Sequence, residues 1–325
     1  MATYKAIHGV KVQYRDSDAT AVEGDVWYNS TFGHLKMYAA LGAWASGGNL
    51  NETRDSLAGA GIQTAAVFFG GNSEPAAFTT ASEEYDGSSW TEGNNLNTGR
   101  YQPGGTGVQT AALACGGGTP SVTDETETYD GTSWTEVGDL NTSRRACSGH
   151  GSTTAALCAG GSPGPYYDVR EEYNGTSWTE GDNLNEARQG LFADCGTQTA
   201  GLIAGGQSGT PSPGTNAASS ESYDGSSWTE GNNLNTGRSD STGFGIQTAA
   251  MSVGGNTGSI TGIAESYDGT SWTEVADLAT ARSSLGAASN APNTLGIVGG
   301  GGNGSQTNAT EEWTVAASIE TVAFD

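Results

Sequence analysis

The octapeptide Tyr129-Asp-Gly-Thr-Ser-Trp-Thr-Glu136 decides the fold of this 325-residue chain, because close copies of it occur five times. An Asp-Gly pair between two short segments that carry tyrosine and tryptophan is typical of a β-hairpin. A hairpin that returns at a regular spacing indicates a repeat architecture. The copies are Tyr85–Glu92, Tyr129–Glu136, Tyr173–Glu180 (with Asn174 for the aspartate), Tyr223–Glu230 and Tyr267–Glu274.

The repeat extends on both sides of this hairpin. The tryptophan series reaches back to Trp44, and its members are 46, 44, 44, 50 and 44 residues apart. A leucine follows each tryptophan at +6, an arginine at +10 and a glycine pair at +26 or +27. The members are Trp44, Trp90, Trp134, Trp178, Trp228 and Trp272; Arg54, Arg100, Arg144, Arg188, Arg238 and Arg282; and Gly70–Gly71, Gly116–Gly117, Gly160–Gly161, Gly205–Gly206, Gly254–Gly255 and Gly299–Gly300.

Each copy has the pattern of four short strands, which the second copy illustrates. Arg100–Gly107 is rich in glycine, Gln109–Cys115 is small and apolar, and Thr126–Tyr129 and Ser133–Val137 flank the hairpin turn. Asp130–Gly131 predicts a type I′ turn, in which both central residues have a positive φ. No segment has a sustained 3.6-residue apolar period, so the sequence predicts very little helix.

Four antiparallel strands in a unit of about 44 residues are the pattern of a β-propeller blade. The order of apolar run, Gly-Gly, tyrosine and tryptophan resembles the kelch repeat over residues 44–317. The resemblance implies an all-β chain with a six-bladed kelch-like β-propeller, preceded by a small N-terminal β-hairpin segment over residues 1–43. We expect the Trp44 segment to close blade six as its outer strand, since this hides two strand edges. We expect residues 318–325 to form a C-terminal strand that competes for this edge or pairs with the N-terminal segment.

The repeated tryptophans and arginines are interpreted as structural. Blades diverge towards the rim of a propeller, so large aromatic side chains fill the gap between neighbours; the alternative is a platform for stacking carbohydrate. Each repeated arginine is expected to pair with a repeated glutamate or with backbone carbonyls. The alternative for the arginines is a ring around a central channel that binds an anion.

Composition and charge exclude several functions. The net charge is −24, which argues against a nucleic-acid partner, and no apolar run is long enough to insert in a membrane. Residues 1–43 are neutral, so the whole negative charge lies in residues 44–325. Large aliphatic residues are scarce and glycines number 52, but 8 Trp and 12 Tyr supply material for a core.

The sequence offers no catalytic constellation. Its histidines are His8, His34 and His150, and it has no metal-binding motif, so we predict no enzyme activity, no cofactor and no metal. A kelch-type copper oxidase would need clustered His, Tyr and Cys ligands. The hairpin motif departs from the sialidase Asp-box, since glycine directly follows the aspartate. The cysteines are predicted to be small buried residues: Cys115, Cys147, Cys158 and Cys195.

The copies differ most in the segment that follows each glycine pair. In a four-stranded blade this loop lies on the same face as the link to the next blade, so all six loops share one face. Variable loops on a constant frame are typical of a recognition surface; the alternative is that these loops merely tolerate change. Aromatic and arginine side chains dominate binding hot spots. The candidate binding residues are therefore Phe78, Tyr166, Tyr167, Asp168 and Arg170.

The N-terminal segment carries a second resemblance. Glu23–Tyr38 (EGDVWYNSTFGHLKMY) predicts a hairpin, with Val26–Asn29 and Leu35–Tyr38 as its strands. It is similar to a short segment found in structural proteins of tailed bacteriophages, where it precedes receptor-facing or decorating domains. The resemblance implies a docking segment that binds other virion proteins. The candidate docking residues are Trp27, Tyr28, Leu35 and Tyr38.

Together these features predict a bacteriophage virion structural protein, of tail-fibre or receptor-binding type, that forms a homo-oligomer in the particle. Its propeller face would bind a glycan or protein of the host surface. One alternative is a capsid or tail decoration protein without a receptor role. Another is a kelch-type interaction module or glycan-binding protein unrelated to phages.

Overall fold

The computed structural model describes residues 13–18, 25–74, 78–190, 193–209 and 214–321. These residues form strands, turns and loops, and none of them is in a helix, so no helix capable of crossing a membrane is found among them. Two compact units are present. One contains residues 1–43 with residues 314–325, and the other contains Trp44–Trp313.

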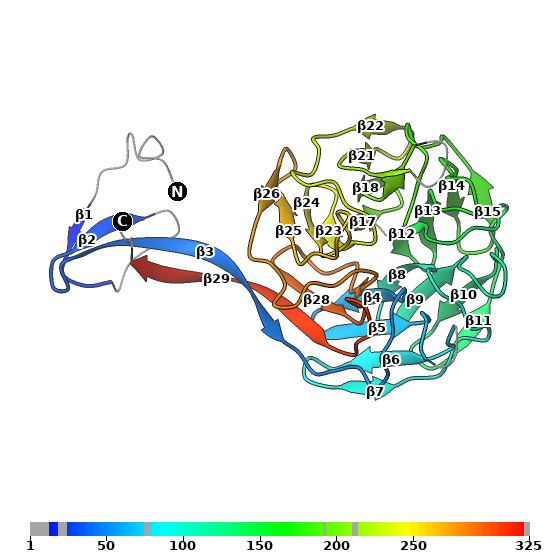
Figure 1. Cartoon of the computed structure of the whole chain (residues 1–325), viewed down its shortest axis with the longest axis horizontal. Helices are drawn as coiled ribbons and strands as arrows, with labels where there is room; N and C mark the ends of the chain where they lie inside the picture. Colours follow the sequence, from blue (N-terminus) through cyan, green and yellow to red (C-terminus); the bar gives the residue numbers. More distant parts are fainter. Residues whose placement is uncertain (1–12, 19–24, 75–77, 191–192, 210–213, 322–325) are drawn as a thin grey trace. The chain divides into compact units, whose positions relative to one another are not determined.

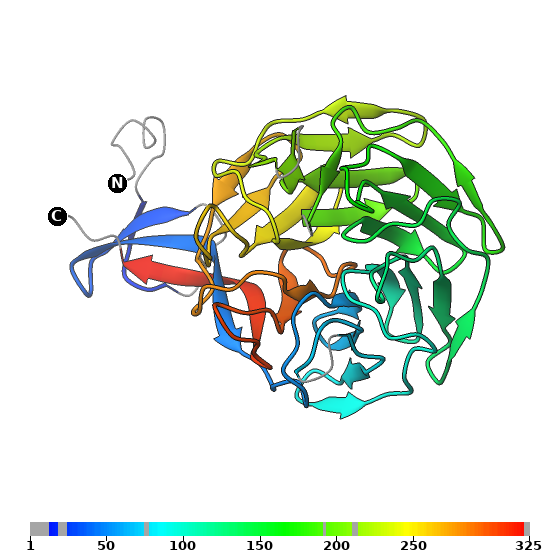
Figure 2. The same cartoon turned by 45° about the vertical axis from the view of Figure 1, so that its right-hand side comes forward.

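Four-stranded antiparallel sheets make up the larger unit and surround an axis, as Figures 1 and 2 show. In each sheet the strands follow one another in chain order from the axis to the rim. The first sheet contains β4 (Ala58–Ile62), β5 (Ala65–Phe69), β6 (Ser82–Tyr85) and β7 (Trp90–Glu92), and the second contains β8 (Gly104–Val108), β9 (Ala111–Cys115), β10 (Thr126–Tyr129) and β11 (Trp134–Glu136). The third contains β12 (Ser148–Ser152), β13 (Ala155–Ala159), β14 (Arg170–Tyr173) and β15 (Trp178–Glu180), and the fourth contains β17 (Ala193–Thr197), β18 (Ala200–Ala204), β21 (Ser220–Tyr223) and β22 (Trp228–Glu230). The fifth contains β23 (Thr242–Ile246), β24 (Ala249–Val253), β25 (Ala264–Tyr267) and β26 (Trp272–Glu274). A small extra sheet joins β16 (Arg188–Gln189), β19 (Gln207–Ser208) and β20 (Thr215–Asn216).

The last sheet joins the two ends of the chain. From the axis outward it contains β27 (Gly286–Ala287), β28 (Leu295–Gly299), β29 (Thr310–Thr321) and β3 (His34–Ser46). Within the larger unit, the rings of Trp44 and Trp313 are 5.2 Å apart, and this pair takes the place of the Tyr–Trp pair of the other sheets. The N–H of Gly47 donates to the carbonyl of Thr310 at 3.0 Å. The outermost strand of this sheet therefore comes from the start of the chain.

The strand pattern agrees with the sequence, but the type of hairpin turn does not. In the second copy the predicted Thr126–Tyr129 strand is β10, and Gln109–Thr110 belongs to a turn. Gly131 has a φ of 88°, whereas Asp130 has no positive φ, so a type I′ turn is wrong. The Asp130 carboxylate accepts the N–H groups of Thr132 at 2.8 Å and Ser133 at 2.7 Å. This side-chain acceptor closes a four-residue loop with one left-handed glycine.

These turns should be visible in an acid titration. In Asp86 and Asp224, N–H donors from the turn, first among them Ser89 and Ser227, lower the carboxyl pKa to about 2. A carboxyl with a lowered pKa stabilises the turn above about pH 4 and loses this effect as the pH falls towards 2. We therefore expect both carboxyl groups to titrate near pH 2 in carbon NMR, and midpoints near 4 would contradict the turn geometry.

One glycine pair is shifted from its predicted position. In the first five copies both members of the pair have a positive φ, but in the last copy the left-handed glycines are Gly300 and Gly301 rather than Gly299–Gly300. Gly299 is instead the final residue of β28. Glycine suits these left-handed positions because it lacks a Cβ. Crowding by the neighbouring backbone also favours glycine here. A Cβ on Gly300 would lie 2.6 Å from the carbonyl oxygen of Arg54.

A ring of backbone hydrogen bonds surrounds one end of the axis. The residue two positions after each repeated arginine has a positive φ, and five of the six are not glycine. In five of the six, all except Gly190, its N–H donates to the carbonyl of the corresponding residue in the preceding sheet. The links are Gln102 to Ser56, Ala146 to Gln102, Asp240 to Gly190, Ser284 to Asp240 and Ser56 to Ser284. The last of these links joins the first sheet to the last one.

A loop of the last sheet plugs the other end of the axis. Asn290, in the β27–β28 loop, donates its side-chain N–H groups to the carbonyls of Gly107 at 2.8 Å and Gly151 at 3.4 Å. Beside it, the Ser289 hydroxyl donates to the carbonyl of Gly59 at 3.3 Å. We call residues 288–294 the plug loop. It ties the last sheet to the first three.

Aromatic side chains fill the layers between neighbouring sheets. Trp134 stacks on Tyr129 with ring centroids 5.0 Å apart, and it contacts Phe69 of the preceding sheet at 4.8 Å. The hydroxyl of Tyr129 donates to Glu84, again in the preceding sheet. Such buried tryptophans occur at Trp90, Trp134, Trp178, Trp228 and Trp272, whereas Trp44 is only half-buried. Buried tryptophans of this kind have no face open for stacking carbohydrate.

The smaller unit contains the predicted hairpin. β2 (Val26–Asn29) pairs with β3 in antiparallel register from Val26 opposite Met37 to Asn29 opposite His34. A strand that was not predicted, β1 (Gln13–Arg15), lies parallel to β2. The final residues of β29 lie beside β3, and Lys36 donates to the hydroxyl of Thr321 at 2.6 Å. Residues 1–12 and 322–325 of the predicted segments lie outside the described residues.

Candidate functional site: the loop face of the propeller

Bridges between strands gather the variable loops on one face. The residue after a repeated arginine pairs with the residue that follows the glycine pair of the same copy. This places the start of each loop against the link that enters the sheet. The pairs are Asp55 with Asn72, Tyr101 with Gly118, Arg145 with Ser162, Ser239 with Asn256 and Ser283 with Gly302. We call this side of the ring the loop face; residues 75–77 and 210–213 of its loops lie outside the described residues.

The repeated arginines clamp the two ends of these loops. Arg54 donates to the carbonyls of Gly70 at 3.1 Å and Ala81 at 3.0 Å, which are the first and last positions of the first loop. Arg100 makes the same pair of bonds to Gly116 and Glu125. The clamp recurs at Arg188 and Arg282, while Arg144 and Arg238 bond differently. The loops can therefore vary in sequence while their ends stay fixed.

Each arginine also forms a buried ion pair with a glutamate of the third strand. In the first copy, Arg54 Nη2 lies 2.7 Å from Glu83 Oε1. Burial lowers the pKa of the Arg54 guanidinium, and the charge of Glu83 opposes this effect. Because the arginines are buried and paired, the alternative of an arginine ring that binds an anion is wrong. The pairs are Arg54–Glu83, Arg100–Glu127, Arg144–Glu171, Arg188–Glu221, Arg238–Glu265 and Arg282–Glu311.

A further repeated residue completes the clamp and was missed from the sequence. The second carboxylate oxygen of Glu127 accepts both the backbone N–H and the side-chain N–H of Asn97, each at 2.8 Å. The signal was visible, because an asparagine follows the +6 leucine in five of the six copies. The asparagine–glutamate pairs are Asn51–Glu83, Asn97–Glu127, Asn141–Glu171, Asn185–Glu221 and Asn235–Glu265.

Two of the predicted binding residues are buried and cannot serve as exposed anchors. Arg170 is the first residue of β14 and is 4% exposed. It pairs with Glu172, and its guanidinium lies 4.6 Å from the ring centroid of Tyr223. Tyr166 is 8% exposed, and its hydroxyl accepts the N–H of Gly214 at 2.7 Å. Both side chains hold parts of the propeller together, which sequence position alone did not reveal.

The other predicted binding residues are partly exposed, and one belongs to a cluster that spans three sheets. The ring of Phe78 stacks on Tyr101 at 6.3 Å, and the Arg145 guanidinium lies 5.2 Å from the centroid of Tyr101. All three are half-buried, as are Tyr167 and Asp168. We call Phe78, Tyr101 and Arg145 the aromatic–arginine cluster. Tyr101 and Arg145 were missed, although both follow a repeated arginine at a position that is small or polar in the other copies.

A polar hollow of about 310 Å³ lies elsewhere on the loop face. Gln306 spans it by accepting the N–H of Glu74 at 3.1 Å and donating to the Asp55 carboxylate at 3.2 Å. The tip of another loop contributes Ile260. Two carboxylates with no lysine or arginine in the lining favour a partner group that is cationic or rich in hydrogen-bond donors.

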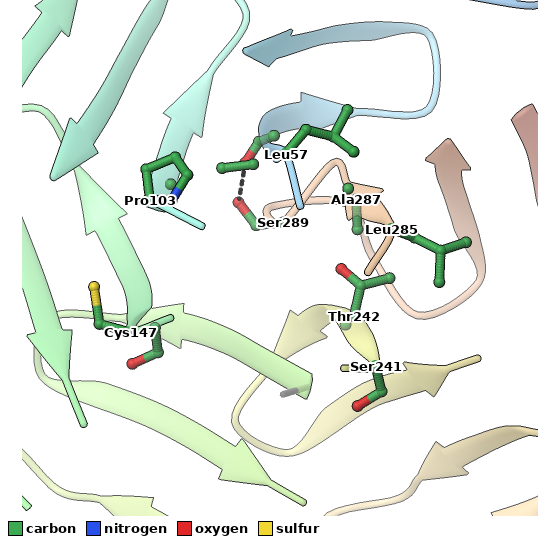
Figure 3. Close-up of a pocket in the computed structure, with 14 residues that line it drawn as sticks. Leu57, Pro103, Cys147, Ser241, Thr242, Leu285, Ala287 and Ser289 are labelled. Atoms are coloured by element: carbon green, nitrogen blue, oxygen red, sulfur yellow. Dashed lines mark hydrogen bonds between the residues drawn. The ribbon is translucent and has the colours of Figure 1, made fainter. Parts of the chain in front are cut away.

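The axis itself is too narrow for a ligand. Figure 3 shows the cavity between the inner strands, with Leu57, Pro103, Cys147, Thr242 and Ser289 around it. Its volume is about 30 Å³. A space of this size holds about one water molecule. This cavity between the inner strands is therefore too small to be the recognition site.

The docking residues in the smaller unit need a correction. Trp27 is fully buried, and its indole N–H donates to Asp18 at 3.0 Å, so it forms the core of this unit instead of its surface. Tyr28, Leu35 and Tyr38 are half-buried. The exposed apolar side chains that sequence reasoning missed among the described residues of this unit are Tyr14, at 79%, Phe32, at 66%, and Leu41, at 52%.

The closed arrangement of four-stranded antiparallel sheets defines a β-propeller. Among solved structures, that of YjhT, a kelch-like β-propeller, is similar to this chain with a TM-score of 0.68. The match covers 84% of this chain and 99% of the YjhT chain at 12% sequence identity, so the likeness concerns the fold alone. No family model and no curated protein matches the chain.

Proposed function

We propose that this propeller is a binding protein without catalytic activity that recognises its partner through the loop face. The observation that carries the proposal is the arginine clamp, which fixes both ends of loops that differ in sequence. A rigid frame lowers the entropy cost of presenting a binding loop. The aromatic–arginine cluster is the proposed centre of the surface, since such side chains dominate binding energies.

The proposed setting is the virion of a tailed phage, in which the propeller attaches the particle to a glycan or protein of the host surface. Support comes from the resemblance of residues 23–38 to segments of phage structural proteins. The smaller unit would bind other virion proteins through Tyr14, Tyr28 and Phe32. The rings of Tyr14 and Tyr28 are 5.2 Å apart and form an apolar surface suited to docking.

Replacing the aromatic–arginine cluster should strongly weaken binding of the chain to host cells. With Phe78, Tyr101 and Arg145 all changed to serine, we expect binding of the labelled chain to host cells to fall at least about 30-fold. The matched control changes Ile62 and Val108 to serine. These side chains are 41% and 47% exposed and end β4 and β8, away from the loop face.

The outcomes separate the alternatives. Equal binding by the cluster variant and the control would overturn the proposed loop-face role. If the unchanged chain does not bind host cells and labelled virions carry it on the head, a decoration protein would be favoured. Binding of the unchanged chain to a defined glycan would identify a glycan-binding module.

A further inference from the structure

Three cysteines meet in the layer between the second and third sheets. Cys115 is the last residue of β9, Cys158 lies in β13, and Cys147 precedes β12. Their sulfur atoms all lie within 4.8 Å of one another, and all three residues are buried free thiols. Residues far apart in sequence thus bring three soft ligand atoms to one point.

This cluster is a local departure from the repeat. The corresponding positions of other copies hold apolar or small residues, so the fold itself does not require sulfur there. The backbone also leaves room for the sulfur atoms, because residue 104 is a glycine. A Cβ at this position would lie only 3.0 Å from the Cys115 sulfur and 3.2 Å from the Cys147 sulfur. The corresponding residues are Phe69 and Ala159 for Cys115, Leu57 and Pro103 for Cys147, and Phe68 and Ala114 for Cys158.

A positive charge adjoins the cluster. Arg144 Nε donates to the Cys158 sulfur at 3.4 Å. A thiolate is the form of cysteine that binds metals. The Arg144 guanidinium therefore lies beside one of the three sulfur atoms.

The chemistry selects the class of ion. Soft thiolate ligands favour Cu(I) and Zn(II), and structural zinc takes four ligands in a tetrahedron. Among the described residues this cluster supplies three ligand groups. Three-coordinate binding suits Cu(I). Access is short, because Cys147 also lines the axial cavity shown in Figure 3.

We propose that Cys115, Cys147 and Cys158 form a trigonal site for one Cu(I) ion. The ion binds the three sulfur atoms and displaces their S–H protons, which pass to solvent. The copper stays in the Cu(I) state, so no electron donor or acceptor is needed. The site lies inside the propeller and is independent of the proposed loop-face function.

The test uses the full reduced chain titrated with Cu(I) against a competing Cu(I) chelator. We expect one copper ion per chain, an ultraviolet thiolate-to-copper absorption band and a higher thermal unfolding midpoint with copper. Cys158→Ala should weaken copper binding more than about tenfold. Alanine is tolerated at this position in the second copy, where Ala114 stands.

Cys195→Ala is the matched control, because Cys195 is a buried cysteine outside any disulfide and lies in a different layer of the propeller. It should retain the copper ion and the absorption band. Cys115→Ala provides a second cluster variant if Cys158→Ala does not fold. Loss of copper to the chelator by the unchanged chain, or equal retention by the cluster variants and the control, would overturn the site.

Discussion

Arg144→Ala is expected to lower the free energy of unfolding by about 3–5 kcal/mol, because it leaves the Glu171 carboxylate buried without its partner. Arg144 Nη2 and Glu171 Oε1 are 2.9 Å apart, and both side chains are fully buried. Burial already raises the pKa of Glu171 against the opposing charge of Arg144. Chemical denaturation followed by tryptophan fluorescence measures the change.

The adjacent residue gives a matched control. Arg145 is half-buried on the loop face and forms no ion pair within the described residues, so Arg145→Ala should cost less than about 1 kcal/mol. Changing both Arg144 and Glu171 to apolar residues should recover much of the loss, since no unpaired charge then remains. Equal destabilisation by Arg144→Ala and Arg145→Ala would show that the ion pair does not hold the sheet.

Acid should weaken the propeller through a single histidine. Burial lowers the pKa of His150 from 6.5 to about 4, while backbone near Cys195 opposes this shift. The unfolded chain therefore takes up this proton first as the pH falls. The free energy of unfolding should therefore decrease by about 3 kcal/mol as the pH falls from 6.5 to 4.

The measurement compares unfolding free energies of the native chain and His150→Phe between pH 7 and 4. Phenylalanine is suitable because Phe244 occupies the same position of the inner strand β23. Carboxyl groups that titrate in this range affect both proteins, so the difference between the two curves isolates the imidazole. Parallel curves would contradict the proposed cost of charging His150.

The repeat predicted the strands well because each strand is decided by local residues. Thr126–Tyr129 directly precedes the repeated Asp-Gly turn and needs no distant partner to be identified. The turn was predicted with the wrong geometry, since the Asp130 carboxylate replaces a second left-handed residue. The shifted pair Gly300–Gly301 shows a related limit, because the four consecutive glycines 299–302 offer three registers that only backbone packing distinguishes.

The candidate surface was less predictable because it depends on which side chains turn inward. Arg170 and Tyr166 have the residue types of binding anchors, but neighbouring sheets bury them. Trp27 was assigned to docking although Asp18 fixes it in a core. Tyr101 and Arg145 gain their importance from contact across sheets that no spacing along the sequence reveals. The cysteine cluster depends in the same way on register between two sheets.

The plug loop limits how the gene can evolve. A repeat protein can gain or lose whole copies by exchange of repeated segments, because each copy contacts only its neighbours. Both strands that seal the circle lie at the chain ends, outside the exchanged segments, so sealing alone would permit other copy numbers. Asn290 does not permit other copy numbers, because its single side chain must reach Gly107 and Gly151 on the far side of the axis. A seventh copy would widen the centre beyond that reach, so natural selection on copy number would act first on this asparagine.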